Sequence, residues 1–530
     1  MIKYTAILIC ITSIIFSLIE GSNYLDTHHD AIIFSNSLFI MNGLLPYRDF
    51  YVQYGIVQPT ITAFFFKVFG AKFALQNLVV ALAYAVFLYF NFKIITKLIN
   101  EKAGLLFLII LFFLEPFVIL PWPNFFMGMF AAIALYYFVL FLDERKSNYF
   151  YITLFLICML PLTRLNAGVI IVPIFLLLSI IVTVKSRSIL NYLKLVVALS
   201  PLYLIFYLIN DTDFIKQALI LPSEYILPLY FKIPNDILYI AALHINLFFL
   251  EPNLFSVVSA KEILFIWRYV LILGISISAI YILYSIVKSR MFSRDNAIIF
   301  IFAACAGSMS SSVFPIFDSF RAINAWFPFL IIIFFLGSKY LSYKKFYTIF
   351  MFFPLFLAYI NFTTYAVSIP TLLTLFKPDN FNVQLVDFSK SINIETRESF
   401  DRGLDKPQAL ELNDQQRLPL LQYRKLFNIL KTECNNKKFI STSEDYFIYL
   451  LFPDMYNKLA HKMYYYQAFN TLKGIPVDAN LELYPDFKDV LNNHDGLCYI
   501  YHHKKPKILL EGLKKFDKQV TLGDITIYIR

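Results

Sequence analysis

The chain has 530 residues, of which 59% are hydrophobic and only 15% are charged, and its mean hydropathy is +0.64. Soluble globular proteins carry about 45–50% apolar and about 25% charged residues. The composition therefore excludes an ordinary soluble enzyme, a disordered chain and a nucleic-acid-binding domain, and it predicts a polytopic membrane protein. The net charge of +10 is expected to reside in basic loops, which face the cytoplasm by the positive-inside rule.

Apolar stretches that are long enough to cross a bilayer, or nearly so, recur along the first 370 residues. A membrane-spanning helix needs about 20 mostly apolar residues. Eleven segments are predicted to span: 3–20, 71–98, 103–120, 124–142, 149–163, 168–184, 190–209, 263–287, 297–316, 322–338 and 346–368. The first is interpreted as a retained signal-anchor helix, because Leu18-Ile19-Glu20-Gly21 lacks a small-residue cleavage site.

Basic residues are concentrated in alternate connections between these segments. They are Lys3, Lys93, Lys97, Lys102, Arg145, Lys146, Lys185, Arg187, Lys194, Lys288, Arg290, Arg294, Lys339, Lys344 and Lys345. With eleven spans all of them fall on one side of the membrane. The N-terminus is therefore predicted to lie in the cytoplasm and the C-terminus outside it.

Three regions are then predicted on the outer face: a loop at 21–70, a loop at 210–262, and the C-terminal tail from 371. The tail loses the long apolar runs and has domain size, so we divide the chain into a membrane domain, 1–370, and an extracytoplasmic α/β domain, 371–530. Helices are expected near 414–432 and 443–452. Strands are expected near 437–441, 496–501 and 519–529.

Two of the five cysteines, Cys434 and Cys498, fall in this outer domain. The outside of a bacterial inner membrane is oxidising, so a disulfide between them is predicted, with two free thiols as the alternative. Cys10, Cys158 and Cys305 lie in predicted spans, where packing is the simplest interpretation.

The first outer loop carries a concentration of polar residues close to the membrane. Charge near the bilayer is costly and is usually retained for a role. The polar residues are Asp26, His28, His29, Asp30, Arg48, Asp49, Tyr54 and Gln58. Between them, residues 31–41 are too short to span and partly amphipathic, which favours a helix in the plane of the interface, and residues 60–69 are expected to form a second one.

Two arginines are predicted at the same outer rim, Arg164 in Leu-Thr-Arg-Leu-Asn-Ala-Gly and Arg321 in Phe-Asp-Ser-Phe-Arg. The planar guanidinium fork suits phosphate because it can bond two oxygens at once. A carboxylate is ionised at neutral pH unless it is buried. Together these groups can deprotonate an acceptor and hold a phosphate leaving group.

The stretch D-A-I-I-F-S-N-S-L-F-I-M-N-G-L-L-P-Y-R-D-F from Asp30 to Phe50, followed by G-I-V-Q-P and by F-F-K-V-F-G ending at Gly70, resembles the first outer loop of the GT-C membrane glycosyltransferases. The protein O-mannosyltransferase and lipid A aminoarabinose transferase branch is the most similar. The L-T-R-L-N-A-G segment at 162–168 resembles the mid-chain arginine turn of that branch. The remainder of the chain resembles it only in architecture.

The resemblance implies inverting transfer of a sugar from a polyprenyl-phosphate donor to an envelope lipid, glycan or protein at the outer face of a bacterial inner membrane. The family's acidic positions match Asp30 and Asp49, the implied catalytic residues. Arg164 and Arg321 are expected to hold the donor phosphate, and the substrate-contact candidates are His29, Tyr54 and Gln58. No cofactor is required by this interpretation.

The chain departs from the family pattern at two places. Many members have Asp-Glu where this chain has Asp30-Ala31, and many have Lys-Pro-Pro where it has Gln58-Pro59-Thr60. Without that lysine, Arg164 or Arg321 must carry more of the phosphate contact.

Each candidate has an alternative interpretation. Asp30 could cap the interfacial helix, Asp49 could pair with Arg48 or cap a turn, and Asp26 could be the working carboxylate instead. The two arginines could anchor helix ends at headgroups. A divalent ion could bind at His28 and His29 with the neighbouring carboxylates, although ligands within five residues are poorly spaced for a rigid site.

Two other functional classes compete with the glycosyltransferase. A transporter or flippase of a lipid-linked or polar solute would favour ionisable residues at mid-membrane and helices broken by Gly or Pro, whereas this chain places its charges at the rim and has only 15 glycines. A polysaccharide polymerase or ligase would put arginines in a large late outer loop, but residues 210–262 contain none.

Overall fold

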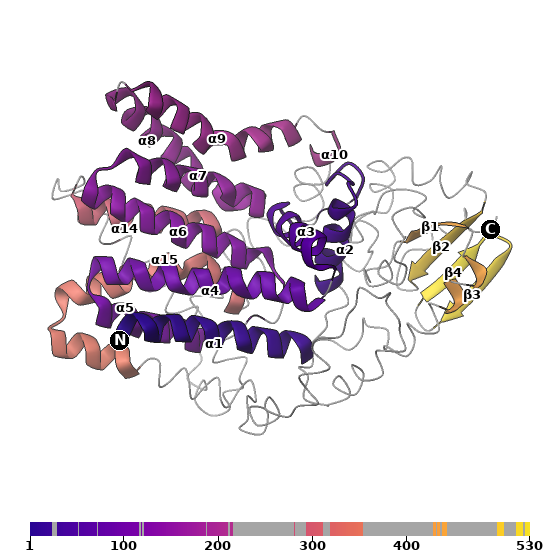
Figure 1. Ribbon diagram of the computed structural model, residues 1–530, viewed down its shortest axis with the longest axis horizontal. Coiled ribbons are helices and arrows are strands. Elements are labelled where there is room, and N and C mark those ends of the chain that lie inside the picture. The colour runs from indigo at the N-terminus through magenta and orange to yellow at the C-terminus, as the bar shows by residue number, and fades with distance from the viewer. Residues whose placement is uncertain are drawn as a thin grey trace, which may run out of the picture. The chain divides into compact units, whose positions relative to one another are not determined.

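Figure 1 shows the computed structural model of the chain. It describes residues 1–23, 29–50, 52, 54–71, 73–115, 118, 121–186, 188–209, 212–215, 280, 293–310, 319–352, 428–430, 432–434, 437–441, 496–502, 516–522 and 525–530. The chain falls into two compact units. The helical unit consists of residues 1–20, 77–207 and 241–381, and the second unit of residues 21–76, 208–240 and 382–530.

The helical unit is built from long apolar helices. They are α1 (Ile2–Asn23), α4 (Phe73–Leu98), α5 (Glu101–Leu114), α6 (Pro123–Glu144), α7 (Ser147–Thr163), α8 (Ile171–Ser186), α9 (Ile189–Ile209), α14 (Arg294–Met309) and α15 (Ser319–Tyr340), with the 3₁₀ turn η1 (Leu165–Gly168) between α7 and α8. Within the described ranges, four helices are long and apolar enough to cross a membrane: Ala74–Leu98, Pro123–Glu144, Ile189–Leu208 and Ile323–Tyr340. The chain is therefore a multi-pass membrane protein.

The observed helices follow most of the predicted spans. Most residues of the spans predicted at 263–287 and 346–368 lie outside the described residues, so the total of eleven stays a prediction. The span predicted at 103–120 is too long, because α5 ends at Leu114 and Glu115 leaves the helical conformation at φ −145° and ψ 86°. The residue before a proline is sterically disfavoured in a helix, and Pro116 follows Glu115.

Four helix ends are joined by a chain of ion pairs. Asp143 at the end of α6 accepts from Arg294 Nε at 2.6 Å and lies 3.5 Å from Lys97 Nζ of α4. Arg294 also pairs with Asp295 at 3.6 Å, and Asp295 bonds Lys339 of α15. Three basic residues predicted to share one side of the membrane therefore lie at one end of the helical unit.

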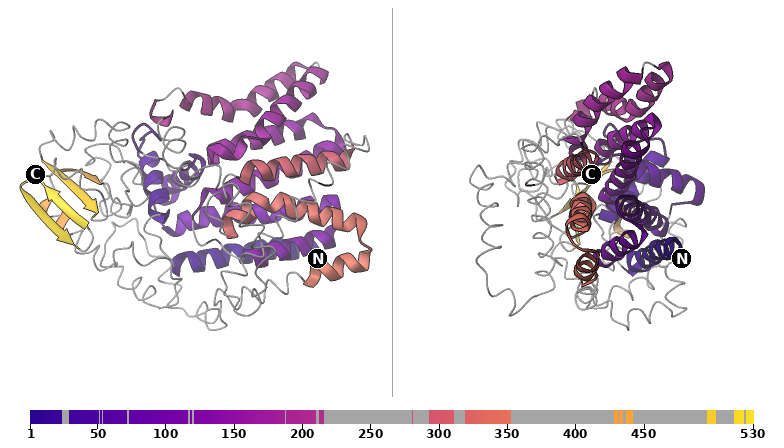
Figure 2. Two further views of the ribbon diagram at one scale, coloured as in Figure 1. Left: turned by 180° about the vertical axis from the view of Figure 1, so that it is seen from behind. Right: turned by 90° about the vertical axis from the view of Figure 1, so that its left-hand side faces the viewer.

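Aromatic side chains fill the interior of the helical unit. Tyr84 of α4 makes an edge contact with Phe125 of α6 at 5.3 Å between ring centroids, and Phe87 of α4 makes one with Phe327 of α15 at 5.0 Å. Helices α6, α7, α14 and α15 run side by side there (Figures 1 and 2). Where α6 and α15 come closest, a Cβ at Gly128 would lie only 2.6 Å from Oδ1 of Asn324.

Within the described residues, the second unit contains three helices and one sheet. The helices are α2 (His29–Met41), α3 (Val57–Phe69) and α10 (Thr212–Ile215), and the strands are β1 (Lys438–Ser441), β2 (Leu497–His502), β3 (Lys518–Leu522) and β4 (Ile525–Ile529). The strand order is β1-β2-β4-β3, with β1 parallel to β2 and the other neighbours antiparallel.

The strands agree with the sequence at two places and differ at a third. The predicted strands near 437–441 and 496–501 correspond to β1 and β2. The single strand predicted at 519–529 is wrong, because this stretch forms the hairpin β3–β4. Residues 428–430 and 432 of the predicted helix at 414–432 are helical; residues 414–427 and 431, and the helix predicted at 443–452, lie outside the described residues. The α/β domain as a whole stays a prediction.

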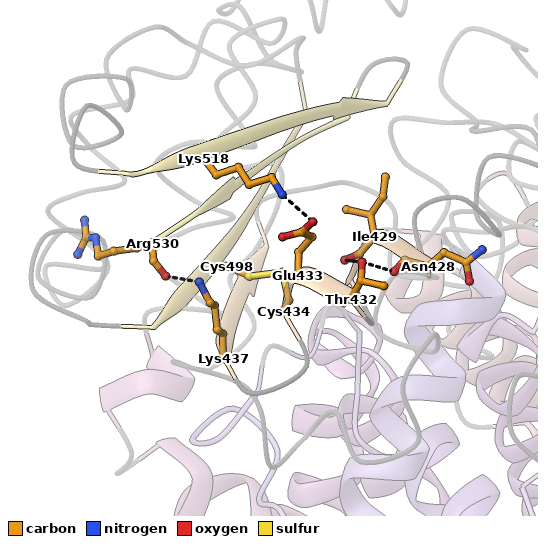
Figure 3. Close-up of a disulfide and its surroundings, with 9 residues drawn as sticks. All are labelled: Asn428, Ile429, Thr432, Glu433, Cys434, Lys437, Cys498, Lys518 and Arg530. Atoms are coloured by element: carbon orange, nitrogen blue, oxygen red, sulfur yellow. Dashed lines mark hydrogen bonds and ion pairs between the residues drawn. A yellow bond between two sulfur atoms is a disulfide. The ribbon is translucent and has the colours of Figure 1, made fainter.

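The predicted disulfide is present. Cys434, just before β1, is bonded to Cys498 on β2, and both side chains are buried (Figure 3). Two contacts flank it: Lys518 Nζ donates to Glu433 Oε1 at 2.6 Å, and Lys437 Nζ donates to the carbonyl of Arg530 at 2.6 Å.

Candidate functional site

The acidic candidate Asp30 lies in the first turn of α2, which begins at His29. A carboxylate in the first turn is stabilised by the partial positive charge of the helix N-terminus. The side chains of His29 and Asp30 lie outside the part of the chain that is described, and so do residues 24–28 with the alternative carboxylate Asp26.

Helix α2 is confirmed, but its side chains do not show the expected amphipathic burial, and its position at the membrane interface stays a prediction. All residues from Ala31 to Ser37 are buried, so this stretch of the helix has no exposed face. The serines need no water, because Ser35 Oγ donates to the carbonyl of Ile32 and Ser37 Oγ to that of Ile33. Polar residues that bond back to their own helix gave the sequence its amphipathic pattern.

Helix α3 packs on α2 and presents a second face outward. Phe34 of α2 and Phe66 of α3 lie 4.8 Å apart between ring centroids. Phe64 on the opposite face and Phe69 at the end of the helix are exposed at 64% and 60%. This exposed aromatic face fits the predicted helix at the interface, although the helix begins at Val57, three residues earlier than expected.

The segment after α2 turns sharply. Gly43 has φ 86°, and its N–H and that of Leu44 donate to the carbonyls of Ile40 and Phe39. This is a Schellman cap, which requires a left-handed residue after the helix and so favours glycine.

Tyr47 follows in the left-handed region at φ 67°, which is uncommon for a bulky residue. Its hydroxyl donates to the carbonyl of Tyr54 at 3.2 Å, and its ring makes an edge contact with Phe214 at 4.7 Å. Burial raises the pKa of Tyr47 well above its ordinary value, so the phenol stays a proton donor. The backbone of the substrate-contact candidate Tyr54 is thereby fixed.

Both carboxylate oxygens of Asp49 are engaged inside the same turn. Oδ2 accepts from the backbone N–H of Leu45 at 2.8 Å. Arg48 donates to Oδ1 through Nε at 2.9 Å and to Oδ2 through Nη2 at 3.0 Å. This geometry is the alternative given above, pairing with Arg48 and closing a turn, and a catalytic role for Asp49 stays a prediction.

Gln58, the remaining candidate of this loop, is fully buried on the inner face of α3. It stands where many GT-C members have the lysine. A contact with substrate stays a prediction.

The arginine turn lies between α7 and α8. Arg164 is extended at φ −151° and ψ 121°, and η1 follows at once. Gly168 at the end of η1 is pressed against α7, since a Cβ there would lie 2.4 Å from Cγ of Pro161. Ser308 of α14 holds the other side: its hydroxyl donates to the carbonyl of Ala167 at 2.7 Å and accepts from the N–H of Ile170 at 3.1 Å.

The guanidinium of Arg164 is anchored on α6. Its Nη1 donates to Oδ1 of Asn124 at 2.9 Å, and Asn124 is fully buried in the first turn of that helix. Among the described residues, the Nδ2 of Asn124 has no hydrogen-bond partner, and Trp122 at the N-cap supplies no side-chain cap. A guanidinium, an amide N–H and a helix N-terminus are all groups that favour an anion.

Arg321 belongs to α15, the helix that packs on the same part of α6. It lies in the first turn of α15, and its side chain lies outside the described residues. Asn324, one turn of helix or less further on, packs against Gly128, which is one turn after Asn124. The backbone positions of the two arginines thus approach the same end of α6. Both belong to the helical unit, whereas Asp30, Asp49, Tyr54 and Gln58 belong to the second unit.

Two side chains that contact the arginine turn from other helices were not predicted from the sequence. Asn124 follows Pro-Trp-Pro at a helix start, where asparagine is common for capping, and Ser308 lies in an apolar run without a distinguishing pattern. In the described ranges, no group of three or more His, Cys, Asp or Glu is arranged to hold a metal ion. The alternative metal site at residues 26–30 falls outside the side chains that are described.

Comparisons with known proteins identify one segment of the chain. Residues 54–207 match the family model described as dolichyl-phosphate-mannose-protein mannosyltransferase. This segment is less than a third of the chain and includes Tyr54, Gln58, Asn124 and Arg164. The predicted resemblance to the GT-C membrane glycosyltransferases is confirmed there. No curated protein matches the chain.

The solved structures similar to the chain are distant. ArnT from Cupriavidus metallidurans bound to undecaprenyl phosphate has a TM-score of 0.42 and 11% identity, over 100% of this chain and 97% of that one. The apo oligosaccharyltransferase of Archaeoglobus fulgidus has a TM-score of 0.46 and 12% identity, over 95% of this chain and 69% of that one. TM-scores below 0.5 do not establish a shared fold.

Proposed function

We propose that the protein transfers a sugar from a polyprenyl-phosphate donor to an envelope lipid, glycan or protein, with inversion at the anomeric carbon. The observation that carries the proposal is the anchored guanidinium of Arg164, which lies with Asn124 and the α6 N-terminus inside the segment that matches the mannosyltransferase family. That family takes its name from a dolichyl-phosphate-linked sugar, which supports a polyprenyl-phosphate donor.

The donor phosphate is assigned to the α6 end of the helical unit. Arg164 and Arg321 bind the phosphate oxygens, and the side-chain amide N–H of Asn124 adds a hydrogen-bond donor. When the bond between the sugar and the phosphate breaks, negative charge develops on the leaving polyprenyl phosphate. Charge-assisted hydrogen bonds that strengthen as this charge develops lower the barrier of the reaction.

The proton transfer is assigned to Asp30. Its carboxylate takes the proton of the acceptor hydroxyl, whose oxygen attacks the anomeric carbon on the face opposite the phosphate. Asp49 is assigned to closing the turn after α2, with a direct role in the chemistry as the alternative from the resemblance. His29, Tyr54 and Gln58 are proposed contacts for the sugar or the acceptor, and no metal is assigned a role.

The proposed location is the inner membrane of a bacterium, with the N-terminus in the cytoplasm and the C-terminal domain outside. The ion-paired end of the helical unit carries Lys97, Arg294 and Lys339 and is assigned to the cytoplasmic side. Arg164 lies at the other end of α7 from its connection to α6, so donor chemistry is assigned to the outer side.

The test combines one variant with one deletion. Asp30→Asn should lower sugar transfer in membranes about 10²–10⁴-fold, the usual contribution of a positioned general base. Asp26→Asn is the matched control, four residues earlier, and should stay near wild type. Wild-type transfer by Asp30→Asn would overturn the assignment of the base.

Mass spectrometry of envelope glycolipids and glycoproteins from a deletion strain tests the reaction itself. Loss of one sugar mass from a glycolipid or glycoprotein is expected, and it would name the donor sugar and the class of acceptor. Accumulation of a complete lipid-linked sugar on the cytoplasmic side, with no enzyme activity in isolated membranes, would instead indicate the flippase alternative.

A further inference from the structure

A groove separates α7 and α9 at some distance from the arginine turn. Its volume is about 570 Å³. It is lined along most of its length by apolar side chains of both helices, among them Phe155, Leu156, Val197 and Ala198, and at one end by Asn148 and Lys194. A groove of this size lies in the range of small-molecule and cofactor sites.

The groove opens on a surface that belongs in hydrocarbon. Helix α9 is long and apolar enough to cross a membrane, yet only 17% of its apolar window is buried. Val196, Val197 and Phe206 are exposed at 69%, 65% and 62%. In a bilayer this surface meets acyl chains, and a groove in it is filled by the same material because water is absent there.

The polar end of the groove carries the ammonium group of Lys194, which has no carboxylate partner among the described residues. Lys194 Nζ donates to Oδ1 of Asn148 at 2.6 Å and to Oδ1 of Asn191 at 3.4 Å, both neutral acceptors. No ion pair involves Lys194 within the described ranges, in contrast to Arg294 and Lys339. An ammonium has three donors, so Lys194 retains one for a further acceptor.

This polar end lies near the first residues of α7 and α9. Asn148 is the second residue of α7, and Lys194 is in the second turn of α9. Arg164 follows the last residue of α7, about 24 Å from Asn148 at 1.5 Å per residue. The polar end therefore lies at the membrane face opposite the proposed donor site.

We propose that the groove between α7 and α9 binds an anionic phospholipid from the leaflet at the Lys194 end. One acyl chain occupies the apolar part of the groove, and the phosphate accepts hydrogen bonds from Lys194 and from the amide of Asn148. The charge of the ammonium selects an anionic headgroup over a zwitterionic one, as basic pockets between spanning helices do. The site is independent of the proposed sugar transfer.

Native mass spectrometry tests the headgroup. The full-length protein is reconstituted in nanodiscs of phosphatidylcholine doped with phosphatidylglycerol. It is then released from the nanodiscs in the mass spectrometer, and the lipids that stay bound are identified by mass. The wild type should retain one phosphatidylglycerol. Lys194→Gln should lower the ratio of retained phosphatidylglycerol to phosphatidylcholine about five-fold, which corresponds to about 1 kcal/mol per lysine at a charged surface. Lys194→Arg should keep the ratio, and the exposed Lys344→Gln is the matched control.

A second pair of variants tests the groove. Val197→Trp fills it and should reduce retention of both lipids, whereas Val196→Trp adds the same bulk on an exposed neighbour that does not line it. Equal retention of the two lipids by the wild type, or an unchanged ratio in Lys194→Gln, would overturn the headgroup assignment. Equal retention by the two tryptophan variants would overturn the groove as the site.

Discussion

Arg164 and Asn124 are joined by a hydrogen bond of 2.9 Å from the guanidinium to the side-chain carbonyl, although they are 40 residues apart. The bond links the turn after α7 to the first turn of α6. Asn124 is fully buried, so it holds the guanidinium from a rigid position. An arginine fixed in this way loses less conformational entropy when it binds a phosphate than a free one would.

Substitutions at Asn124 should change donor use in a defined order. Asn124→Ala removes the anchor, and donor kcat/KM should fall about ten-fold. Asn124→Asp places a carboxylate against the guanidinium, which cancels its charge and repels phosphate, so the fall should be larger. Arg164→Ala should cost about 10–100-fold, as for a lost hydrogen bond to a charged group. The measurement is donor titration at saturating acceptor, with melting temperature as the control for folding.

An Asn124→Asp variant as active as Asn124→Ala would contradict a phosphate at this place, because the added negative charge would then have nothing to repel. If activity falls in parallel with melting temperature in all three variants, the hydrogen bond serves folding alone.

Much of the helical frame could be predicted from the sequence because long apolar runs have few other outcomes. The ends of helices and strands were predicted less accurately where a single turn-forming residue interrupts the hydrophobic pattern. Pro116 stops α5 within an apolar run. The segment 519–529 was taken as one strand because its alternation is continuous, although Gly523 and Asp524 stand between β3 and β4 and such a pair is typical of a tight hairpin.

The residues of the candidate site likewise fall into those that could be predicted from the sequence and those that could not. Arg164 stands out in the sequence because a charge inside an apolar context is costly and needs a reason. Asn124 and Ser308 do not stand out, because a single neutral polar residue in an apolar run is ordinary. Their part in the turn depends on contacts between helices that are far apart in the chain, 40 residues for Asn124 and Arg164 and 141 for Ser308 and Ala167.

Gly168→Ala should displace the arginine turn. The added Cβ would lie 2.4 Å from Cγ of Pro161 and 2.9 Å from Cγ2 of Val172, and the proline ring cannot rotate away. Overpacking of this kind costs about 1–3 kcal/mol. We expect a lower melting temperature together with weaker donor use, measured on the same purified protein.

Gly307→Ala is the matched control. It lies inside α14, and among the described residues its added Cβ would meet only Cδ1 of Ile170 at 3.7 Å, an ordinary contact. Alanine is favoured over glycine in a helix by about 1 kcal/mol, so stability should be unchanged or raised. Similar losses in both variants would show that the close approach of Gly168 to Pro161 is not what fixes the turn.

Asp49 and Arg48 should differ in their effects. The side chains of Asp49 and Arg48 are exposed at 25% and 57%, so the ion pair contributes about 0.2–1 kcal/mol. Arg48→Ala should therefore lower the free energy of unfolding only slightly. Asp49→Ala also removes the acceptor of the Leu45 N–H, and it should cost about 1 kcal/mol more. Asp49→Asn keeps an acceptor oxygen and should resemble Arg48→Ala in both melting temperature and transfer activity.

The asparagine variant separates the two roles considered for Asp49. If it loses transfer by 100-fold or more while its melting temperature equals that of Arg48→Ala, the carboxylate takes part in the chemistry itself. Activity within a few-fold of Arg48→Ala would assign Asp49 to the turn.

Reduction of the disulfide should destabilise the second unit selectively. Cys434 and Cys498 close a loop of 64 residues and tie the segment before β1 to β2. A native disulfide of this kind contributes about 2–4 kcal/mol, largely by restricting the unfolded chain in the loop-entropy account. In the Cys434→Ser, Cys498→Ser double variant, hydrogen exchange should increase in β1, β2 and β4 and stay unchanged in α4 and α6.

Dithiothreitol should have the same effect on the wild type and none on the double variant, because Cys10, Cys158 and Cys305 are already free. Alkylation of both Cys434 and Cys498 in the native, unreduced protein would contradict the bond.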